Sequence, residues 1–257
     1  MDELQRLYKQ DYPAFIEPYL ASKSMQRLKG VDMNCGLQFT SNTGFSSYGP
    51  YSRYEHSVGV ACIIWRFTHD KKQTLAGLFH DISTRVFSHV IDFVKKDYLV
   101  QESTEDETRQ IILQDSVIMN QLLCDGISVD EVSDYHLYPI ADNDSPRLSS
   151  DRLEYTLGNL LNYRKHAIKE IEKYFNDLVV GISEYGSQEI MFQHPEIAEE
   201  FAFGALSCGI IYSCDFDRYG MEQLACILRK AFEETILTES DLYLTEIEVI
   251  KKLSESC

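Results

Sequence analysis

Apolar residues recur at helical spacing along most of the chain, and capping signals divide them into separate helices. Ser52 with Glu55, and Thr104 with Glu107, have the spacing of a capping box, which marks a helix N-terminus. Apolar positions three and four residues apart follow both boxes. The helices predicted in this way cover about residues 52–67, 72–81, 86–96, 104–124, 150–161, 165–178, 195–208, 218–234 and 240–253. The pattern therefore predicts a mainly α-helical chain.

Residues 36–51 break the helical spacing, since they are rich in Ser, Thr, Gly and aromatic residues. The letters QFTSNTGF within them suit either a loop or one short β-hairpin near residues 36–50. The chain has no internal repeat and no low-complexity linker, so we expect a single domain over residues 1–257. Its unusual polar residues lie in about residues 50–165, and about residues 166–257 have the pattern of additional helices packed around that core.

Composition and charge exclude several classes of function. The chain is 44% hydrophobic and 25% charged, which is ordinary for a globular protein. Its formal net charge of −17 repels nucleic-acid backbones, so we expect no nucleic-acid polymer as a partner. A small anion can bind where a cation and arginines reverse this potential locally. No apolar run reaches the roughly 18 residues of a membrane span, and the seven scattered cysteines fit reduced thiols, so we expect a cytoplasmic protein without a membrane segment.

The most unusual polar residues lie between the apolar helices at 52–67 and 72–81. His80 and Asp81 are adjacent at the end of the second helix, and His56 lies 24 residues before His80, at the start of the first helix. Two antiparallel helices would bring both imidazoles together. Imidazole and carboxylate are ligands of first-row divalent metals, and a site with open positions also holds water and substrate. A His-Asp pair alone is a weak signal, so the flanking residues decide its meaning.

Four blocks in order strengthen this signal: RYEHSVGVA (53–61), LAGLFHDI (75–82), FSH (87–89) and SSDRLEY (149–155). Together they resemble the HD-domain metal-dependent phosphohydrolases, nearest to the branch of deoxynucleoside triphosphate triphosphohydrolases. The resemblance covers about residues 50–160. It implies an all-α fold, an HD-domain helical bundle with additional C-terminal helices, and self-association into a homo-oligomer.

The resemblance also implies a role for each matching residue. The residues that match the metal ligands are His56, His80, Asp81 and Asp151. The residues that match substrate contacts are Arg53, Arg152 and Tyr155. His89 matches a histidine that acts in acid/base chemistry at the scissile phosphate. A His-Glu pair supports that histidine in the family; here it corresponds to Glu105 and Asp106, so that the pair lacks its histidine.

The chain departs from the family pattern at two places. Where the family reads Gly-His-x-Pro, this chain has STRV at residues 83–86, and the missing histidine contacts substrate in the triphosphohydrolases. Arg85 would restore a positive charge at that entrance. Gly158 and Asn159 replace a distal acid and an arginine. A nucleoside monophosphate or another small phosphoester therefore fits nearly as well as a deoxynucleoside triphosphate.

Together these residues predict a hydrolase of a nucleotide or a related small phosphate ester, in which a metal-activated water attacks phosphorus. The predicted cofactor is one divalent transition metal ion: manganese, iron, cobalt, nickel or zinc, with magnesium fitting less well. Two alternatives remain open. One is an HD-type di-iron oxygenase, since His89, His136 and several carboxylates lie between the His-Asp pair and Asp151. The other is a non-catalytic nucleotide-binding sensor.

Overall fold

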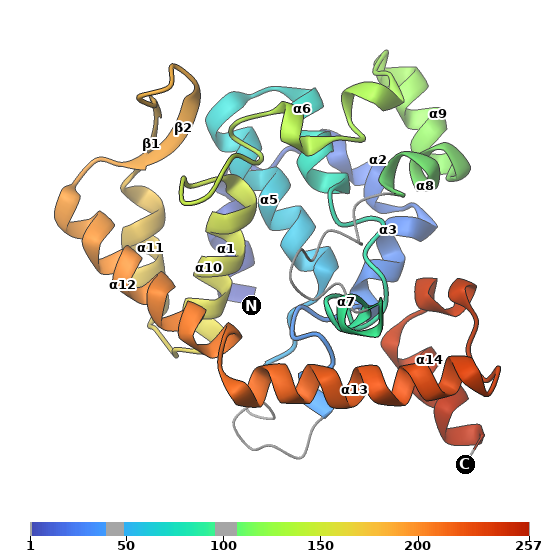
Figure 1. The fold of residues 1–257 in the computed structure, drawn as a ribbon. Coiled ribbons are helices and arrows are strands. Elements are labelled where there is room, and N and C mark those ends of the chain that lie inside the picture. Colours follow the sequence, from blue (N-terminus) through green and yellow to red (C-terminus); the bar gives the residue numbers. More distant parts are fainter. Residues whose placement is uncertain (1, 40–48, 96–106, 257) are drawn as a thin grey trace.

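The computed structural model describes residues 2–39, 49–95 and 107–256, and most of these residues lie in α-helices (Figure 1). This confirms the predicted mainly α class. The described helices are α1 (Asp2–Tyr8), α2 (Glu17–Leu20), α3 (Lys23–Arg27), α5 (Arg53–Thr68), α6 (Lys71–Phe79), α7 (Val90–Lys95), α8 (Thr108–Gln114), α9 (Ser116–Asp125), α10 (Ser150–Asn162), α11 (Ile168–Asn176), α12 (Pro195–Tyr212), α13 (Asp215–Glu233) and α14 (Glu246–Glu255).

Three predicted helices differ from the structure for local reasons. The helix predicted over 240–253 is divided, because a 3₁₀ helix ends at Tyr243 and the Thr245 side chain caps the first turn of α14. The segment predicted as one helix over 104–124 contains a break at Asp115, whose extended backbone ends α8 and whose side chain caps the first turn of α9. The helix predicted over 86–96 begins late, at α7. Phe87 and Ser88 have positive φ angles of 60° and 47°, a left-handed conformation that interrupts a right-handed helix.

The β-hairpin of the described residues consists of β1 (Leu178–Ile182) and β2 (Gln188–Phe192), which pair antiparallel. It is therefore not the hairpin predicted near residues 36–50. In that stretch Leu37–Phe39 form a 3₁₀ turn, and residues 40–48 lie outside the described residues, as does Thr104 of the second capping box. The letters LVVGI of β1 favour a strand because they include β-branched residues, and the turn contains a glycine with a φ of 81°.

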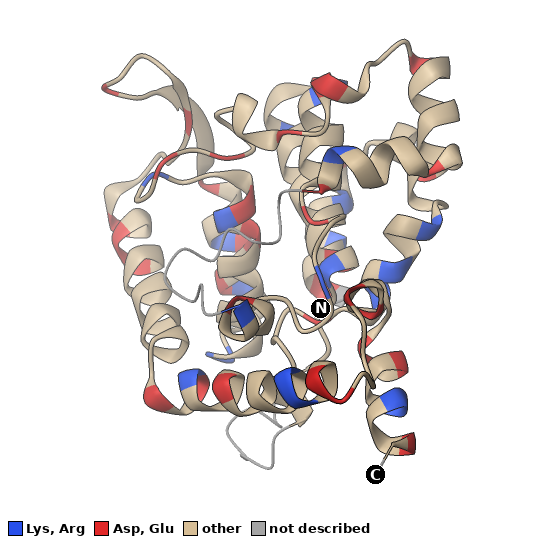
Figure 2. Ribbon diagram, turned by 45° about the vertical axis from the view of Figure 1, so that its right-hand side comes forward, with Lys and Arg blue, Asp and Glu red and all other residues tan. Residues whose placement is uncertain are grey.

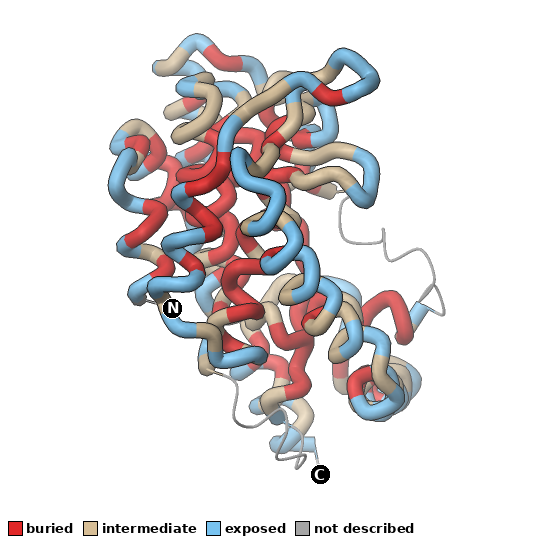
Figure 3. Tube along the Cα trace, turned by 90° about the vertical axis from the view of Figure 1, so that its left-hand side faces the viewer, coloured by how far each residue is buried: buried red, intermediate tan, exposed pale blue. Residues whose placement is uncertain are grey.

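Helix α5 lies at the centre of the fold (Figure 1) and is buried along most of its length, and buried segments gather in the interior of the molecule (Figure 3). Its predicted capping box is confirmed, since Ser52 and Glu55 bond reciprocally at its N-terminus. Helix α6 packs along α5 at close range. A Cβ atom on Gly77 would lie 2.2 Å from Cδ1 of Ile64, so this glycine allows the two helices to approach each other closely. The C-terminal end of α6 thereby lies beside the N-terminal end of α5.

Two apolar clusters divide the helices. The larger cluster includes buried residues of α1, α5, α6, α10, α11 and α12, and the smaller one joins α7, α13 and α14 (Figure 1). Asp and Glu residues are spread over many of the helices (Figure 2). No single described helix is long and apolar enough to cross a membrane, although α12 and α13 pass that test as a pair bent by 44°.

Candidate metal centre

Four predicted ligands converge from three segments of the chain. His56 lies in the first turn of α5, His80 and Asp81 follow directly after α6, and Asp151 is the second residue of α10. His56 Nε2 lies 3.2 Å from His80 Nε2 and 3.0 Å from Asp151 Oδ1. Oδ2 of Asp81 lies 3.5 Å from His80 Nε2 and 3.8 Å from His56 Nε2. Ligand atoms about 2.1 Å from one shared ion lie roughly 3–3.5 Å apart, so this spacing fits a common metal ion.

The orientation of both imidazoles also fits a metal. Nδ1 of His80 lies 2.7 Å from the carbonyl oxygen of Gly77, and Nδ1 of His56 lies 2.5 Å from Oε2 of Glu154. A carbonyl and a carboxylate only accept hydrogen bonds, so each Nδ1 donates. Each Nε2 lone pair is then free to bind an ion and points at the two aspartates. Among the described residues, His56, His80 and Asp151 form the group of histidines and acids able to hold an ion.

The protonation of His56 depends on its two acidic neighbours. Burial lowers the pKa of His56, but the carboxylates of Glu154 and Asp151 outweigh burial and raise this pKa to about 10. Burial raises the pKa of Glu154, which is inaccessible to solvent. In the metal-free protein a proton on His56 therefore holds the two carboxylates together, and a metal ion that binds here must displace that proton.

Sequence reasoning gave Glu154 no role, although it lies in the SSDRLEY block. It orients His56, and it also accepts a hydrogen bond from the buried hydroxyl of Tyr51. Room for its carboxylate comes from Gly59, where a Cβ atom would lie 2.6 Å from Oε1 of Glu154. The signal was available, because Glu154 follows Asp151 by three residues and so shares its face of α10.

Arg53 and Asp81 form a buried ion pair beside the ligands. Nη1 of Arg53 lies 2.9 Å and 3.2 Å from the two carboxylate oxygens of Asp81, and the Thr84 hydroxyl donates to Asp81 Oδ1 at 2.7 Å. Burial alone raises the pKa of Asp81, but the Arg53 guanidinium and the two histidines hold that pKa well below its usual range. Asp81 is thus ionised and fixed in position before any metal binds.

A cavity of about 420 Å³ opens at these ligands. Arg53, His89 and Tyr155, three of the predicted contacts, lie in its wall. His89 Nδ1 lies 3.2 Å from Oδ2 of Asp92, which is fully buried. The predicted partners of His89, Glu105 and Asp106, lie outside the described residues. Sequence reasoning missed Asp92, although its spacing of three residues from His89 places both on one side of the chain.

Arg152 and Arg85, the other two predicted substrate contacts, do not line this cavity. Arg152 donates to the Arg147 carbonyl at 2.9 Å and pairs with Asp142 at 3.2 Å, so it braces the turn that precedes α10. Arg85 lies 3.3 Å from both the Tyr243 hydroxyl and a carboxylate oxygen of Glu107. These partners hold both guanidinium groups in place, and the contact of Arg152 and Arg85 with substrate stays a prediction.

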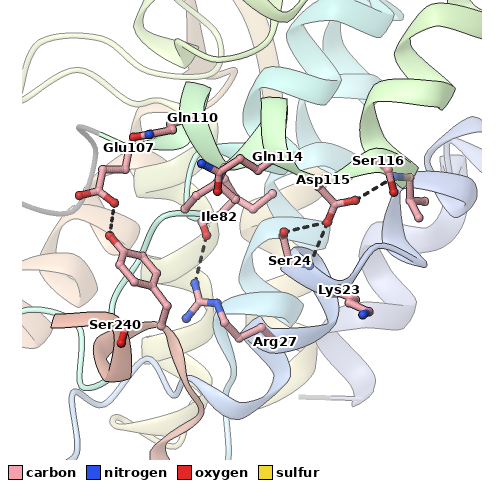
Figure 4. A pocket seen from close by; sticks show the side chains of 13 residues that line it. Lys23, Ser24, Arg27, Ile82, Glu107, Gln110, Gln114, Asp115, Ser116 and Ser240 are labelled. Atoms are coloured by element: carbon pink, nitrogen blue, oxygen red, sulfur yellow. Dashed lines mark hydrogen bonds between the residues drawn. The ribbon is translucent and has the colours of Figure 1, made fainter. Parts of the chain in front are cut away.

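A second cavity, of about 720 Å³, adjoins the loop that follows Asp81 (Figure 4). None of the predicted metal ligands lines it. Its wall contains Arg27, whose Nη2 donates to the carbonyl oxygens of Ile82 at 3.0 Å and Thr84 at 2.8 Å. Since the Thr84 hydroxyl donates to Asp81, Arg27 stabilises the position of a metal ligand indirectly, through this loop.

No protein-family model matches the chain. Over 249 residues the chain is 29% identical to an uncharacterized protein, YdhJ, of Bacillus subtilis, and the match covers 94% of this chain and 71% of that protein. Over 171 residues it is 30% identical to the metal-dependent phosphohydrolase cns2 of Cordyceps militaris. This second match covers 65% of the chain and 46% of the relative, so the chain spans less than half of that relative's length.

The relatives and the geometry agree with the four sequence blocks. A relative named as a metal-dependent phosphohydrolase matches the chain, and two histidines and an aspartate from separate blocks form a metal-binding arrangement. Membership of the triphosphohydrolase branch stays a prediction, because neither relative's name specifies a triphosphate. At the level of the superfamily, these findings support the predicted HD-domain metal-dependent phosphohydrolases.

Proposed function

We propose that this protein hydrolyses a nucleotide or a related small phosphate ester with the help of one divalent transition metal. The observation that carries the proposal is the convergence of four ligand atoms beside a buried arginine, in the wall of a cavity. Phosphate ester hydrolysis requires neutralised phosphate oxygens, a positioned water and a proton for the leaving group. The described residues can supply each of these needs.

The metal held by His56, His80, Asp81 and Asp151 would polarise a phosphate oxygen and lower the pKa of a water molecule. Arg53 stays cationic, because Asp81 raises its pKa above the usual value despite burial. Its guanidinium lies in the cavity wall beside the ligands and neutralises charge on the phosphate. His89 lies in the same wall, where the contact between its Nδ1 and Asp92 orients the ring, so that His89 donates a proton to the leaving oxygen.

The size and charge of the site favour a small substrate. A volume of about 420 Å³ lies within the range of roughly 300–1,000 Å³ that is usual for small-molecule sites. Tyr135, Tyr155, Tyr163 and Tyr212 line it and offer aromatic faces to a base. The net charge of −17 opposes a polymeric nucleic acid. A mononucleotide therefore suits the cavity better than a polymer.

The structure gives little support to the di-iron alternative. That alternative needs further histidine ligands, and His136 is one of the two histidines that the sequence offers. Nδ1 of His136 lies 2.7 Å from Asp142, the side chain is half exposed, and His136 does not line the cavity. We therefore favour a single metal.

A substrate screen tests this proposal. Protein reconstituted with Mn²⁺, Fe²⁺, Co²⁺, Ni²⁺ or Zn²⁺ is incubated with nucleoside mono-, di- and triphosphates and with p-nitrophenyl phosphate. Phosphate, pyrophosphate and tripolyphosphate are resolved separately, and the His80→Ala/Asp81→Ala double variant is the control. We expect metal-dependent release of one of these products. Nucleotide-dependent thermal stabilisation without any release would instead favour the sensor.

A further inference from the structure

The cavity wall contains a segment that none of the four sequence blocks covers. The junction of α12 and α13 contributes Tyr212, Ser213, Asp217, Arg218 and Met221 to the wall. Asp217 lies in the first turn of α13 and is only 7% exposed. A carboxylate at this depth is costly to bury unless a hydrogen bond or a cation compensates for its lost hydration.

Asp217 has no such compensation among the described residues. No described residue hydrogen-bonds to its carboxylate or lies within ion-pairing distance of it. Burial raises the pKa of Asp217 to about 7, and the neighbouring Arg218 offsets only part of this rise. The side chain thus presents unused acceptor atoms to the cavity.

Three other polar side chains in this part of the wall already have hydrogen-bond partners, although the buried Oδ1 of Asn159 has none among the described residues. Tyr212 Oη accepts a hydrogen bond from Asn159 at 2.5 Å, and Tyr163 donates to Asn34 at 2.6 Å. The Ser213 hydroxyl donates to the carbonyl oxygen of Gly209 at 2.8 Å. Asp217 is therefore the acidic group at the α12–α13 end that has capacity for a ligand.

We propose that Asp217 determines specificity by accepting a hydrogen bond from a hydroxyl or amino group of the substrate. This inference rests on the proposed phosphohydrolase function. A carboxylate repels phosphate, so it faces the uncharged part of the substrate, while Arg53 and the metal ligands face the phosphate. In a nucleotide, the donors in the uncharged part are sugar hydroxyls and the exocyclic amine of the base.

If Asp217 had only a structural role, it would act through the dipole of α13. An acidic residue in the first turn of a helix stabilises the helix in this way wherever its side chain points. Asp215 lies in the same turn of α13, is exposed and does not line the cavity. Asp215→Asn is therefore a matched control, since it removes the same charge from the same turn.

Nucleoside binding tests the inference without requiring turnover. Protein reconstituted with Mn²⁺ is titrated with cytidine, uridine and 2′-deoxycytidine by calorimetry. We expect the wild type to bind cytidine, and the dissociation constant for Asp217→Ala to be higher by about 10-fold or more. A hydrogen bond to a charged group contributes a binding free energy of that size. Asp215→Asn should bind like the wild type. Weaker binding of uridine assigns the contact to the base amine, and weaker binding of 2′-deoxycytidine assigns it to the sugar.

Turnover provides the second readout. Asp217→Asn should lower kcat/KM for cytidine monophosphate about 10-fold more than for p-nitrophenyl phosphate, mainly through KM. Equal losses on both substrates, or no nucleoside binding by the wild type, would overturn the role of Asp217. Failure of the proposed function gives a different result, because the wild type would then release no phosphate from any ester. In that case weaker cytidine binding by Asp217→Ala than by the wild type would still support the contact.

Discussion

Two parts of the wall of the 420 Å³ cavity, named the metal end for its ligands and the α12–α13 end for the helix junction, differ in how their polar groups are held. At the metal end three of the four ligands have a second partner: His56 has Glu154, His80 has the Gly77 carbonyl, and Asp81 has Arg53. At the α12–α13 end Asp217 is buried without one among the described residues. The difference indicates that the reactive centre is organised before substrate arrives, whereas the selective end is completed by the substrate itself.

Removing a ligand should have the largest effect at the metal end. We expect His80→Ala to lose the bound metal and to lower phosphate release by more than about 100-fold, because loss of an outer partner alone usually costs about 10–100-fold. Elemental analysis and phosphate release measure both effects. His136→Ala is the control, since His136 does not line the cavity. Full metal content in His80→Ala would refute the assignment.

Glu154→Gln should have the next largest effect, because Glu154 orients His56 without reaching the metal position. The neutral amide accepts a weaker hydrogen bond from His56, so we expect metal affinity to fall about 10–100-fold. Competition with a chelator measures that affinity. Glu172→Gln, an exposed carboxylate on α11, should bind metal like the wild type. If both variants bind metal equally well, the comparison between the two ends fails.

The sequence predicted the metal end well, because its chemistry needs particular residue types at particular spacings. The blocks around His56, His80, Asp81 and Asp151 identified four side chains that the fold brings together. Helical spacing then predicted the elements that hold them. The role of Glu154 was not predicted, because a helical sequence pattern does not distinguish a buried glutamate from an exposed one.

The sequence predicted less where tertiary contacts decide. Arg152 and Arg53 stand in equally suggestive motifs, yet only Arg53 faces the cavity, since carbonyl groups of a preceding turn hold Arg152. Asp217 belongs to no motif, and only the packing of α13 against α7 brings it to the site. Such roles depend on which faces of distant helices meet, which periodicity along one chain does not specify.

Arg27→Ala should have a smaller effect on the metal end. It removes two hydrogen bonds to the loop after Asp81 and leaves the Ile82 and Thr84 carbonyls without this donor. We expect a loss of about 1–3 kcal/mol in the free energy of unfolding, and a decrease in metal affinity smaller than that of Glu154→Gln. Denaturant titration and chelator competition measure the two. Arg109→Ala, which breaks only an exposed ion pair with Asp130, is the control. Unchanged metal affinity in Arg27→Ala would limit Arg27 to stabilising the fold.

The smallest expected effect is a pH dependence of stability at the α12–α13 end. The carboxyl of Asp217 has a pKa of about 7 in the folded chain against 3.8 as its ordinary value. Between these two pH values the folded state binds more protons than the unfolded state, so stability falls as pH rises through this window. The nearby Cys35 stays neutral there, because burial raises its pKa to about 12, and Arg218 is the basic residue beside Asp217.

Asp217→Asn should abolish the fall in stability between pH 4 and pH 7, because an amide does not ionise. Since partial exposure screens the charge, we expect the variant to gain on the order of 2–4 °C in Tm over the wild type at pH 8, and little at pH 4. Thermal unfolding at both pH values measures the difference, with Asp215→Asn as the exposed control. An equal change at pH 4 and pH 8 would mean that Asp217 is ionised at both values. The carboxylate would then be as well compensated as the acids of the metal end, and the contrast between the two ends would disappear.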